Sequence, residues 1–249
     1  MPVDSHLILS HLSTVDAERE RRLATPGLEA RVVEIKTYQQ RRFCHTYADL
    51  LESTRYGAAA RFFLDELYGP ADFTQRDQQF ARVVPALVRL FPQQIIATVG
   101  ALAALHALSE ALDTQMGLHL SSVPAALLAP VPMTRDAYAR AWQATGRVAD
   151  REEQIRLTLA VASQLDRLTR NVLIRKSLQL MRRPAQAAGL ADLQHFLERG
   201  FATFRAMQGA AEFITTIQAR EEALAAALFS ETREVTGSPA NQSRDRLLP

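Results

Sequence analysis

The sequence has very little cysteine, and its charges are close to balanced. Cys44 is the single cysteine among 249 residues, so no disulfide can form within the chain. It stands in a segment expected to be helical, where we expect a buried, unreactive thiol. The formal net charge is only +2, and the arginine clusters are interleaved with acidic residues. This pattern does not favour a nucleic-acid partner.

The sequence also lacks strand-like runs, a signal peptide and a long apolar span. No run of β-branched and aromatic residues indicates a strand, and no basic region precedes an apolar core at the N-terminus. The longest apolar run, residues 95–112, is interrupted by His106 and Glu110 and falls short of a membrane span. We therefore expect a cytoplasmic protein with no membrane partner.

Motifs of the common catalytic classes are missing as well. The chain has no nucleotide-binding glycine pattern, no P-loop, no Gly-x-Ser-x-Gly and no His-Glu-x-x-His. It has no Glu-x-x-His pair, which argues against a di-metal carboxylate enzyme. His45, His119 and His195 are candidate haem ligands, but a lone helical histidine is more often a core residue. We predict no metal and no cofactor, with haem or another apolar cofactor as the minor alternative.

What the sequence does contain is helical periodicity, seen most clearly in residues 55–92. Apolar residues recur there at steps of three and four, as Tyr56, Ala59, Ala60, Phe63 and Leu67. Gly69 and Pro70 predict the end of that helix. Thr74 and Asp77 have the spacing of a capping box for the next one. Pro85 predicts a kink or restart, and Pro92 predicts the first residue of a further helix.

Charged residues flank these apolar positions. Arg55, Asp72, Arg76 and Asp77 have the composition of an arginine–carboxylate network that would hold the corner between the two helices. The alternative is that these side chains are solvated or cap the helices, and we favour it because charged residues are mostly exposed.

Three stretches resemble a protein family. They are FFLDELYGPADF followed by RD, LHALSEALD, and LQHFLERGF. Together they are similar to uncharacterised bacterial all-helical proteins over most of the chain. The resemblance implies a family and brings no activity, ligand or catalytic residue with it.

The remaining pattern predicts an all-α bundle of roughly seven to nine helices. Residues 1–27 are expected to form a loosely attached N-terminal arm, 28–229 a single helical domain, and 230–249 a disordered tail. Long helices are predicted over 28–53, after Pro92 to Met116, and over 150–181 as far as Arg182–Pro184. A short helix is expected from Thr134 or Asp136 to Gly146.

One candidate site emerges from this pattern. His106, Glu110 and Asp113 lie on one face of a helix at steps of four and three. Asp166 falls at a core position with Arg170 one turn on. If the two helices are neighbours, these five side chains line a polar pocket, with the proline-rich residues 117–132 as a lid or as packing. The alternative, which we favour, is that Asp166 pairs with Arg170 and His106 is a core or interface histidine.

Two classes of function follow. The first is a non-catalytic helical interaction or scaffolding protein with a protein partner. It is expected to be a homodimer because its apolar faces are large, notably at Phe201, Phe204, Met207 and Phe213. The second is a ligand-binding protein or enzyme with an interior polar pocket near His106 and Asp166.

Overall fold

The chain is helical throughout the part that the structure describes. The computed structural model describes residues 4–66, 73–120, 133–229 and 247–249. Within these residues it contains eleven α-helices and no strand, which confirms the all-α prediction. The helices are α1 (Ser5–Ala24), α2 (Leu28–Thr46), α3 (Ala48–Glu52), α4 (Gly57–Glu66), α5 (Thr74–Leu90), α6 (Gln93–Leu120), α7 (Arg135–Ala144), α8 (Val148–Thr169), α9 (Val172–Ala187), α10 (Ala191–Ala206) and α11 (Ala211–Phe229).

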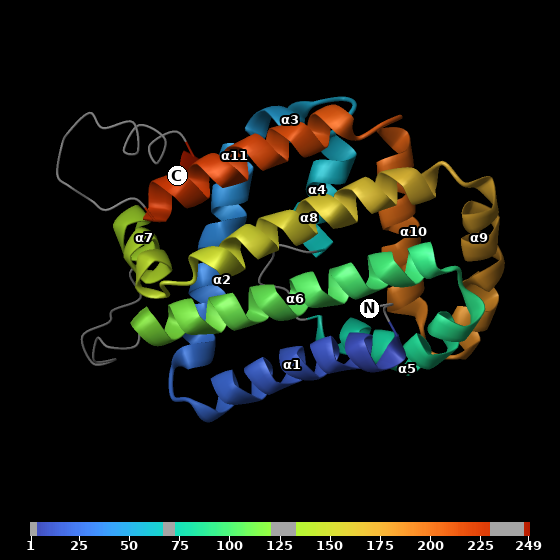
Figure 1. Cartoon of the computed structure of the whole chain (residues 1–249), viewed down its shortest axis with the longest axis horizontal. Coiled ribbons are helices and arrows are strands. Elements are labelled where there is room, and N and C mark those ends of the chain that lie inside the picture. The colour runs from blue at the N-terminus through green and yellow to red at the C-terminus, as the bar shows by residue number, and fades with distance from the viewer. Residues whose placement is uncertain (1–3, 67–72, 121–132, 230–246) are drawn as a thin grey trace.

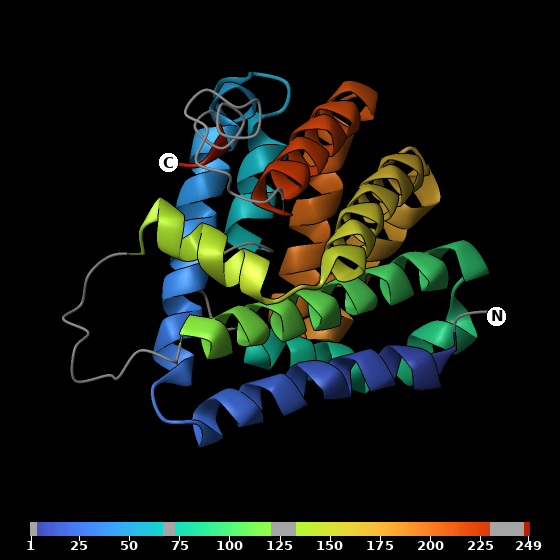
Figure 2. The same ribbon diagram turned by 60° about the vertical axis from the view of Figure 1, so that its left-hand side comes forward.

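The helices form two crossing layers. Helices α1, α6, α8 and α11 lie side by side in that order in one layer (Figure 1), and each contacts the next. Helices α2, α4 and α10 cross behind them, as the turned view in Figure 2 also shows. Contacts of α2 with α6 and of α10 with α8 join the two layers. The core therefore lies between the layers, where apolar faces from distant parts of the chain meet.

Two predicted long helices are each divided in the structure. The backbone leaves helical geometry at Tyr47 (φ −118°, ψ 26°), which separates α2 from the short α3. It breaks again at Asn171, whose Oδ1 accepts a hydrogen bond from the Leu173 backbone N–H at 2.9 Å. Asparagine is a strong N-cap residue, so α9 begins there as a separate helix. These two breaks account for much of the difference between eleven helices and the seven to nine predicted.

The prolines interrupt the helices less than expected. Helix α5 continues through Pro85, and α9 continues through Pro184 to Ala187. Pro92 precedes α6, and its carbonyl accepts from the N–H groups of Ile95 and Ile96. The predictions of a restart at Pro85 and of a helix end at Pro184 are wrong. A proline removes one donor, and burial of the helix elsewhere can outweigh that loss.

The N-terminal helix is packed against the rest of the molecule. Ile8 and Val15 of α1 are fully buried. Ile8 belongs to a cluster with Val84 of α5 and Ile96 of α6. Helix α1 lies along α6 for much of its length (Figure 1). The expectation of loose attachment is therefore wrong for this helix.

The apolar residues that suggested a dimer interface lie inside the protein. Phe204, Met207 and Phe213 are fully buried in a cluster with residues of α4. Their size is explained by the meeting of α4, α8, α10 and α11, so they offer no surface for a second copy. The expectation of a buried thiol at Cys44 is also wrong, because Cys44 is exposed.

Helix α6 stands at the centre of the molecule. By length and composition it is the one described helix that is long and apolar enough to cross a membrane, which the sequence pattern did not indicate. In the structure α1, α2, α7 and α8 contact it. This packing accounts for an apolar surface on several sides of one helix.

Some expectations fall on residues outside the described ranges. They are the helix stop at Gly69 and Pro70, the contribution of Asp72, residues 121–132 of the segment 117–132 proposed as a lid, and residues 230–246 of the tail expected over 230–249.

Candidate functional site

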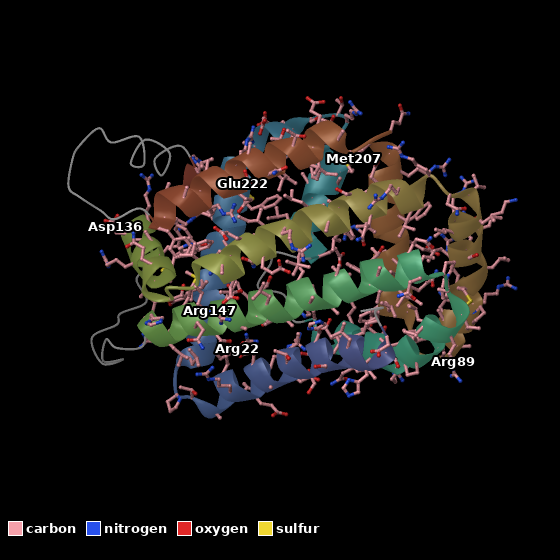
Figure 3. The ribbon with its side chains drawn as sticks, viewed as in Figure 1. Arg22, Arg89, Asp136, Arg147, Met207 and Glu222 are labelled. Atoms are coloured by element: carbon pink, nitrogen blue, oxygen red, sulfur yellow. The ribbon has the colours of Figure 1, made fainter. Side chains whose placement is uncertain are left out.

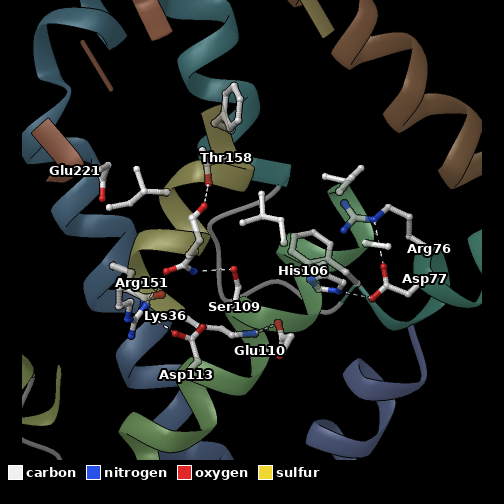
Figure 4. Close-up of a pocket in the computed structure, with 18 of the residues that line it drawn as sticks. Lys36, Arg76, Asp77, His106, Ser109, Glu110, Asp113, Arg151, Thr158 and Glu221 are labelled. Carbon is white, nitrogen blue, oxygen red and sulfur yellow. Dashed lines mark hydrogen bonds and ion pairs between the residues drawn. The ribbon is translucent and has the colours of Figure 1, made fainter. Parts of the chain in front are cut away.

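A cavity of about 150 Å³ lies between the helices. Side chains from both layers line it, with further residues from α5 and α7. Part of the wall is apolar, including Phe63, Leu105 and Ile155. Charged and polar side chains gather at two places around it (Figure 4). An interior cavity with converging polar groups is the first place to look for a binding site.

Three residues predicted to share a helix face line this cavity together. His106, Glu110 and Asp113 of α6 all contribute to the lining. Glu110 and Asp113 are each only 5% exposed. A buried carboxylate is costly unless it is paired, so the partners of these two residues define the site.

Glu110 is held between two cations from different helices. One carboxylate oxygen accepts from Nη1 of Arg22 at 2.6 Å, and the other accepts from Nζ of Lys36 at 2.6 Å. Arg22 is 3% exposed and lies between α1 and α6 (Figure 3). Its Nε donates to Glu29 at 3.1 Å. The Arg22–Glu110–Lys36 bridge therefore fastens α1 and α2 to α6.

This bridge sets the ionisation of Glu110. Burial by itself would raise the pKa of the carboxyl group. Lys36 and Arg22 outweigh that effect and lower the pKa of Glu110 from 4.5 to about 2. The carboxylate is therefore ionised at neutral pH.

The second polar group of the cavity centres on Asp77. Its Oδ2 lies 2.6 Å from Nη2 of Arg19 and 2.9 Å from Nε2 of His106. Burial raises the pKa of Asp77, but His106 and Arg19 lower it further, so the net direction is downward. The capping-box prediction is wrong, because Phe73 rather than Thr74 occupies the N-cap position of α5. The carboxylate is turned inward, where Arg19 and His106 are its partners.

Asp113 has a different environment from Glu110, although the two are one turn apart. Its Oδ1 accepts from Nε2 of Gln39 at 2.8 Å. Burial raises the pKa of Asp113, and Lys36 only partly opposes that effect. Two carboxylates on one face of α6 are thus shifted in opposite directions by their surroundings.

Near Asp113, the lining of the cavity also contains an arginine that stacks on the single tryptophan. The guanidinium of Arg151 lies 3.7 Å from the ring centroid of Trp142. Its Nη1 donates to Gln154 at 2.9 Å, and Gln154 donates in turn to Ser109 of α6 at 2.8 Å. These contacts fix the register of α8 against α6.

Sequence reasoning missed the cations of this site. Arg22, Lys36, Arg42 and Arg151 were not assigned to it, yet all except Lys36 are buried. Arg42 donates to Glu221 of α11 across the protein. One signal was present in the sequence: Arg42 follows Ile35 and Tyr38 at helical spacing, which places a charge at a core position of α2.

The structure separates Asp166 and Arg170 from this cavity. Nη2 of Arg170 lies 2.6 Å from Asp166, and the other Asp166 oxygen accepts from the Ala210 backbone at 3.1 Å. Both residues line a second hollow near Gly209. The predicted pairing is confirmed, and the joint pocket is wrong. Helices α6 and α8 are neighbours, but Asp166 lies twelve residues beyond Gln154, about 18 Å along the helix.

The predicted corner network is only partly formed. Arg76 lies 3.7 Å from Asp77 and 3.7 Å from Glu66, and its guanidinium covers the rings of Phe73 and Phe196. Arg55 is elsewhere and donates to the backbone carbonyls of Met207 and Gly209. Asp72 is outside the described residues.

The histidines do not gather into a metal or haem site. In the described ranges, no group of three or more histidine, cysteine, aspartate or glutamate side chains has the geometry to hold a metal ion. His45, His119 and His195 are all exposed, so none of them faces the interior cavity. The interior contains a small cavity lined in part by charged side chains.

Comparison with known proteins identifies a family of unknown function. No curated protein and no solved structure matches the chain. A family model described as a domain of unknown function, DUF8198, matches residues 18–235. This range covers every residue of the cavity except Leu12. The chain therefore belongs to the DUF8198 family.

Proposed function

We propose that this protein binds a small organic molecule in the cavity between α2, α6, α7, α8 and α11. The observation that supports the proposal is the convergence of buried charged side chains on one interior space. Glu110, Asp113 and Arg151 are each at most 5% exposed and border the same cavity. Apolar side chains would fill such a space at lower cost, because buried ion pairs add little to stability. Perturbed ionisable groups around a cavity are typical of binding sites.

The volume limits the size of the ligand. The cavity measures about 150 Å³. A cavity of roughly this size in another protein accepts benzene, whereas sites for drug-sized ligands span about 300–1,000 Å³. The proposed ligand is therefore about the size of a benzene ring with one substituent. This size is far below that of haem.

A single tryptophan makes the proposal testable. Trp142 is the one tryptophan of the chain and lines the cavity. We expect the freshly purified chain to carry extra mass in native mass spectrometry that is lost on denaturation. We also expect benzene-sized molecules to change the Trp142 fluorescence in a saturable way. An unaltered native mass together with no fluorescence response to any such molecule would refute the proposal.

A variant that fills the cavity provides the control for this test. Ala103 is buried and lines the cavity, so Ala103→Leu should occupy part of the space and weaken binding about tenfold or more. Ala219 lies on the exposed side of α11, so Ala219→Leu adds the same atoms outside the site. Binding that is equal in the two variants would show that ligands bind elsewhere.

A second candidate function rests on the surface of α9. Val172, Leu173, Leu180 and Met181 of this helix are all exposed, Leu180 at 78%. The helix also has Arg175, Lys176, Arg182 and Arg183 and no acidic residue. We propose that this apolar, basic face supports the interaction or scaffolding role and any homodimer, with an acidic surface as its counterpart.

The oligomeric state tests this second proposal. Sedimentation velocity at micromolar concentration should show a dimer for the wild-type chain and a monomer for Leu180→Glu. Leu90→Glu is the matched control, because Leu90 is equally exposed, at 78%, and ends α5. Both variants should keep their unfolding free energy within about 0.5 kcal/mol. A monomeric wild-type chain would exclude the homodimer.

A further inference from the structure

We propose that the ligand of the cavity is a small monoanion with an apolar body, of the carboxylate class. Its anionic group would lie at the end formed by Arg42, Tyr138, Trp142 and Arg151, and its apolar body against the opposite wall. This inference rests on the proposed function and deepens it, because it names the chemistry that the cavity selects.

The balance of buried charge supports an anion. Three cations line this end of the cavity, with Lys36 on Glu110, Arg42 on Glu221, and Arg151 on Trp142. The carboxylates that face them are Glu110, Glu221 and Asp113. With all three ionised, the charges at this end are equal in number. Burial raises the pKa of Asp113, and protonation of that group leaves the cations in excess by one.

The neighbouring charges just outside the lining balance one another. Arg22 does not line the cavity, and it is paired with Glu29 at 3.1 Å as well as with Glu110. At the far end of the cavity Arg19 and Arg76 are opposed by Asp77 and Glu66, so that end is balanced when His106 is neutral. A positive excess in a low-dielectric interior is stabilised by a bound anion and repels a cation.

Unused hydrogen-bond donors point to the same class of ligand. Nε1 of Trp142, Nε of Arg42 and the hydroxyl of Tyr138 are buried and have no hydrogen-bond partner among the described residues. All three residues line the cavity, and Tyr138 is fully buried. An indole N–H and a guanidinium N–H can only donate, so the missing partner is an acceptor. A carboxylate accepts several hydrogen bonds and is charged to match.

The rest of the lining suits an apolar body. Phe63, Leu105, Ile155 and Ile217 belong to the wall of the same cavity. A benzene-sized ring would bury its surface against these side chains, which contributes affinity without selecting charge. The cavity therefore separates the two parts of the ligand: apolar side chains hold the body, and the cationic end selects the head group.

Three molecules of one shape test this inference. Benzoate, benzamide and benzamidine share a planar outline and carry charges of −1, 0 and +1 at neutral pH. Titration of the full-length chain, followed by Trp142 fluorescence and by calorimetry, should show benzoate binding about tenfold more tightly than benzamide. Benzamidine should bind most weakly of the three.

The Tyr138→Phe variant examines the role of the donors. It removes one hydroxyl that has no partner, so the variant should fold as the wild-type chain does. Benzoate affinity should fall about fivefold or more, and benzamide affinity should fall less. If none of the three molecules binds the wild-type chain, the proposed function itself fails. If the three molecules bind equally, or benzamidine binds best, ligand binding in the cavity is supported and the preference for a monoanion is excluded.

Discussion

The Glu110→Gln variant is expected to unfold with a free energy about 3 kcal/mol lower than that of the wild-type chain. Glutamine keeps the shape of glutamate but not its charge, so Arg22 and Lys36 would lose the anion that each contacts at 2.6 Å. Arg22 cannot move to solvent, because only 3% of it is exposed. Arg22 keeps its contact with Glu29, but without the carboxylate between them Arg22 and Lys36 repel each other, and the helices that they join separate more easily. Denaturant unfolding followed by circular dichroism measures the loss.

A surface pair provides the matched control. Glu153 accepts two hydrogen bonds from Arg156 at 2.6 Å, as short as those to Glu110, but both side chains are more than 40% exposed. Exposed pairs of this kind contribute about 0–1 kcal/mol. Glu153→Gln should therefore change stability by no more than that. If the two variants lose the same small amount, the bridge at Glu110 is not a significant source of stability.

The pH dependence provides a second readout of the same variant. The pKa of Glu110 is lowered from 4.5 to about 2 in the folded protein, so its ionised form is the one that folding favours. The stability that it contributes is complete above about pH 4.5 and is lost as the pH falls toward about 2. The difference between wild type and Glu110→Gln should therefore shrink over that window. Asp77 acts in the same direction in both proteins, so the comparison cancels its contribution. Asp113 acts in the opposite direction, and because Glu110 helps to raise its pKa, the substitution also moves the pKa of Asp113 downward.

The spacing of residues along the sequence was sufficient to predict which side chains of α6 share the face that borders the cavity. The steps of four and three between His106, Glu110 and Asp113 put them on one side of α6, and all three border the cavity. The same reasoning paired Asp166 with Arg170, one turn apart. Both results depend only on the geometry of a single helix, which the sequence determines directly.

The contacts between helices could not be obtained in this way. The partners of Glu110 are Arg22 and Lys36, which lie 88 and 74 residues away in the chain. Which face of α2 meets α6 depends on how all the helices pack, not on the spacing within either. The register of α8 is a second example, since the contact of Gln154 with Ser109 places Asp166 outside the cavity.

The large apolar faces near the C-terminus were misread for the same reason. An apolar stripe on one helix shows that something covers it, but not whether the cover is another helix or a second copy. Phe204 is covered by Phe63 of α4, with ring centroids 5.8 Å apart, and Phe63 also contacts Phe213. The apolar stripe was predicted correctly, but it packs against helices of the same chain and not against a second copy.

The Phe204→Ala variant distinguishes a core residue from an interface residue. Phe204 is fully buried in the single chain, so removing its ring should leave a cavity and lower the free energy of unfolding by about 3–5 kcal/mol. The loss should be the same at low and high protein concentration, because the residue packs within one chain. Denaturant unfolding at two concentrations, with sedimentation velocity on the folded variant, measures both properties.

The matched control is Phe201→Ala on the same helix. Phe201 is only partly buried, so it fills less of the core and its removal should have a clearly smaller effect. If Phe204 contacted a second copy instead, Phe204→Ala would weaken association, and the measured stability would depend on protein concentration. A stability loss that is small for Phe204→Ala, or that follows the dimer population, would contradict the packing described here. A large, concentration-independent loss leaves the exposed residues of α9 as the better place to look for any partner.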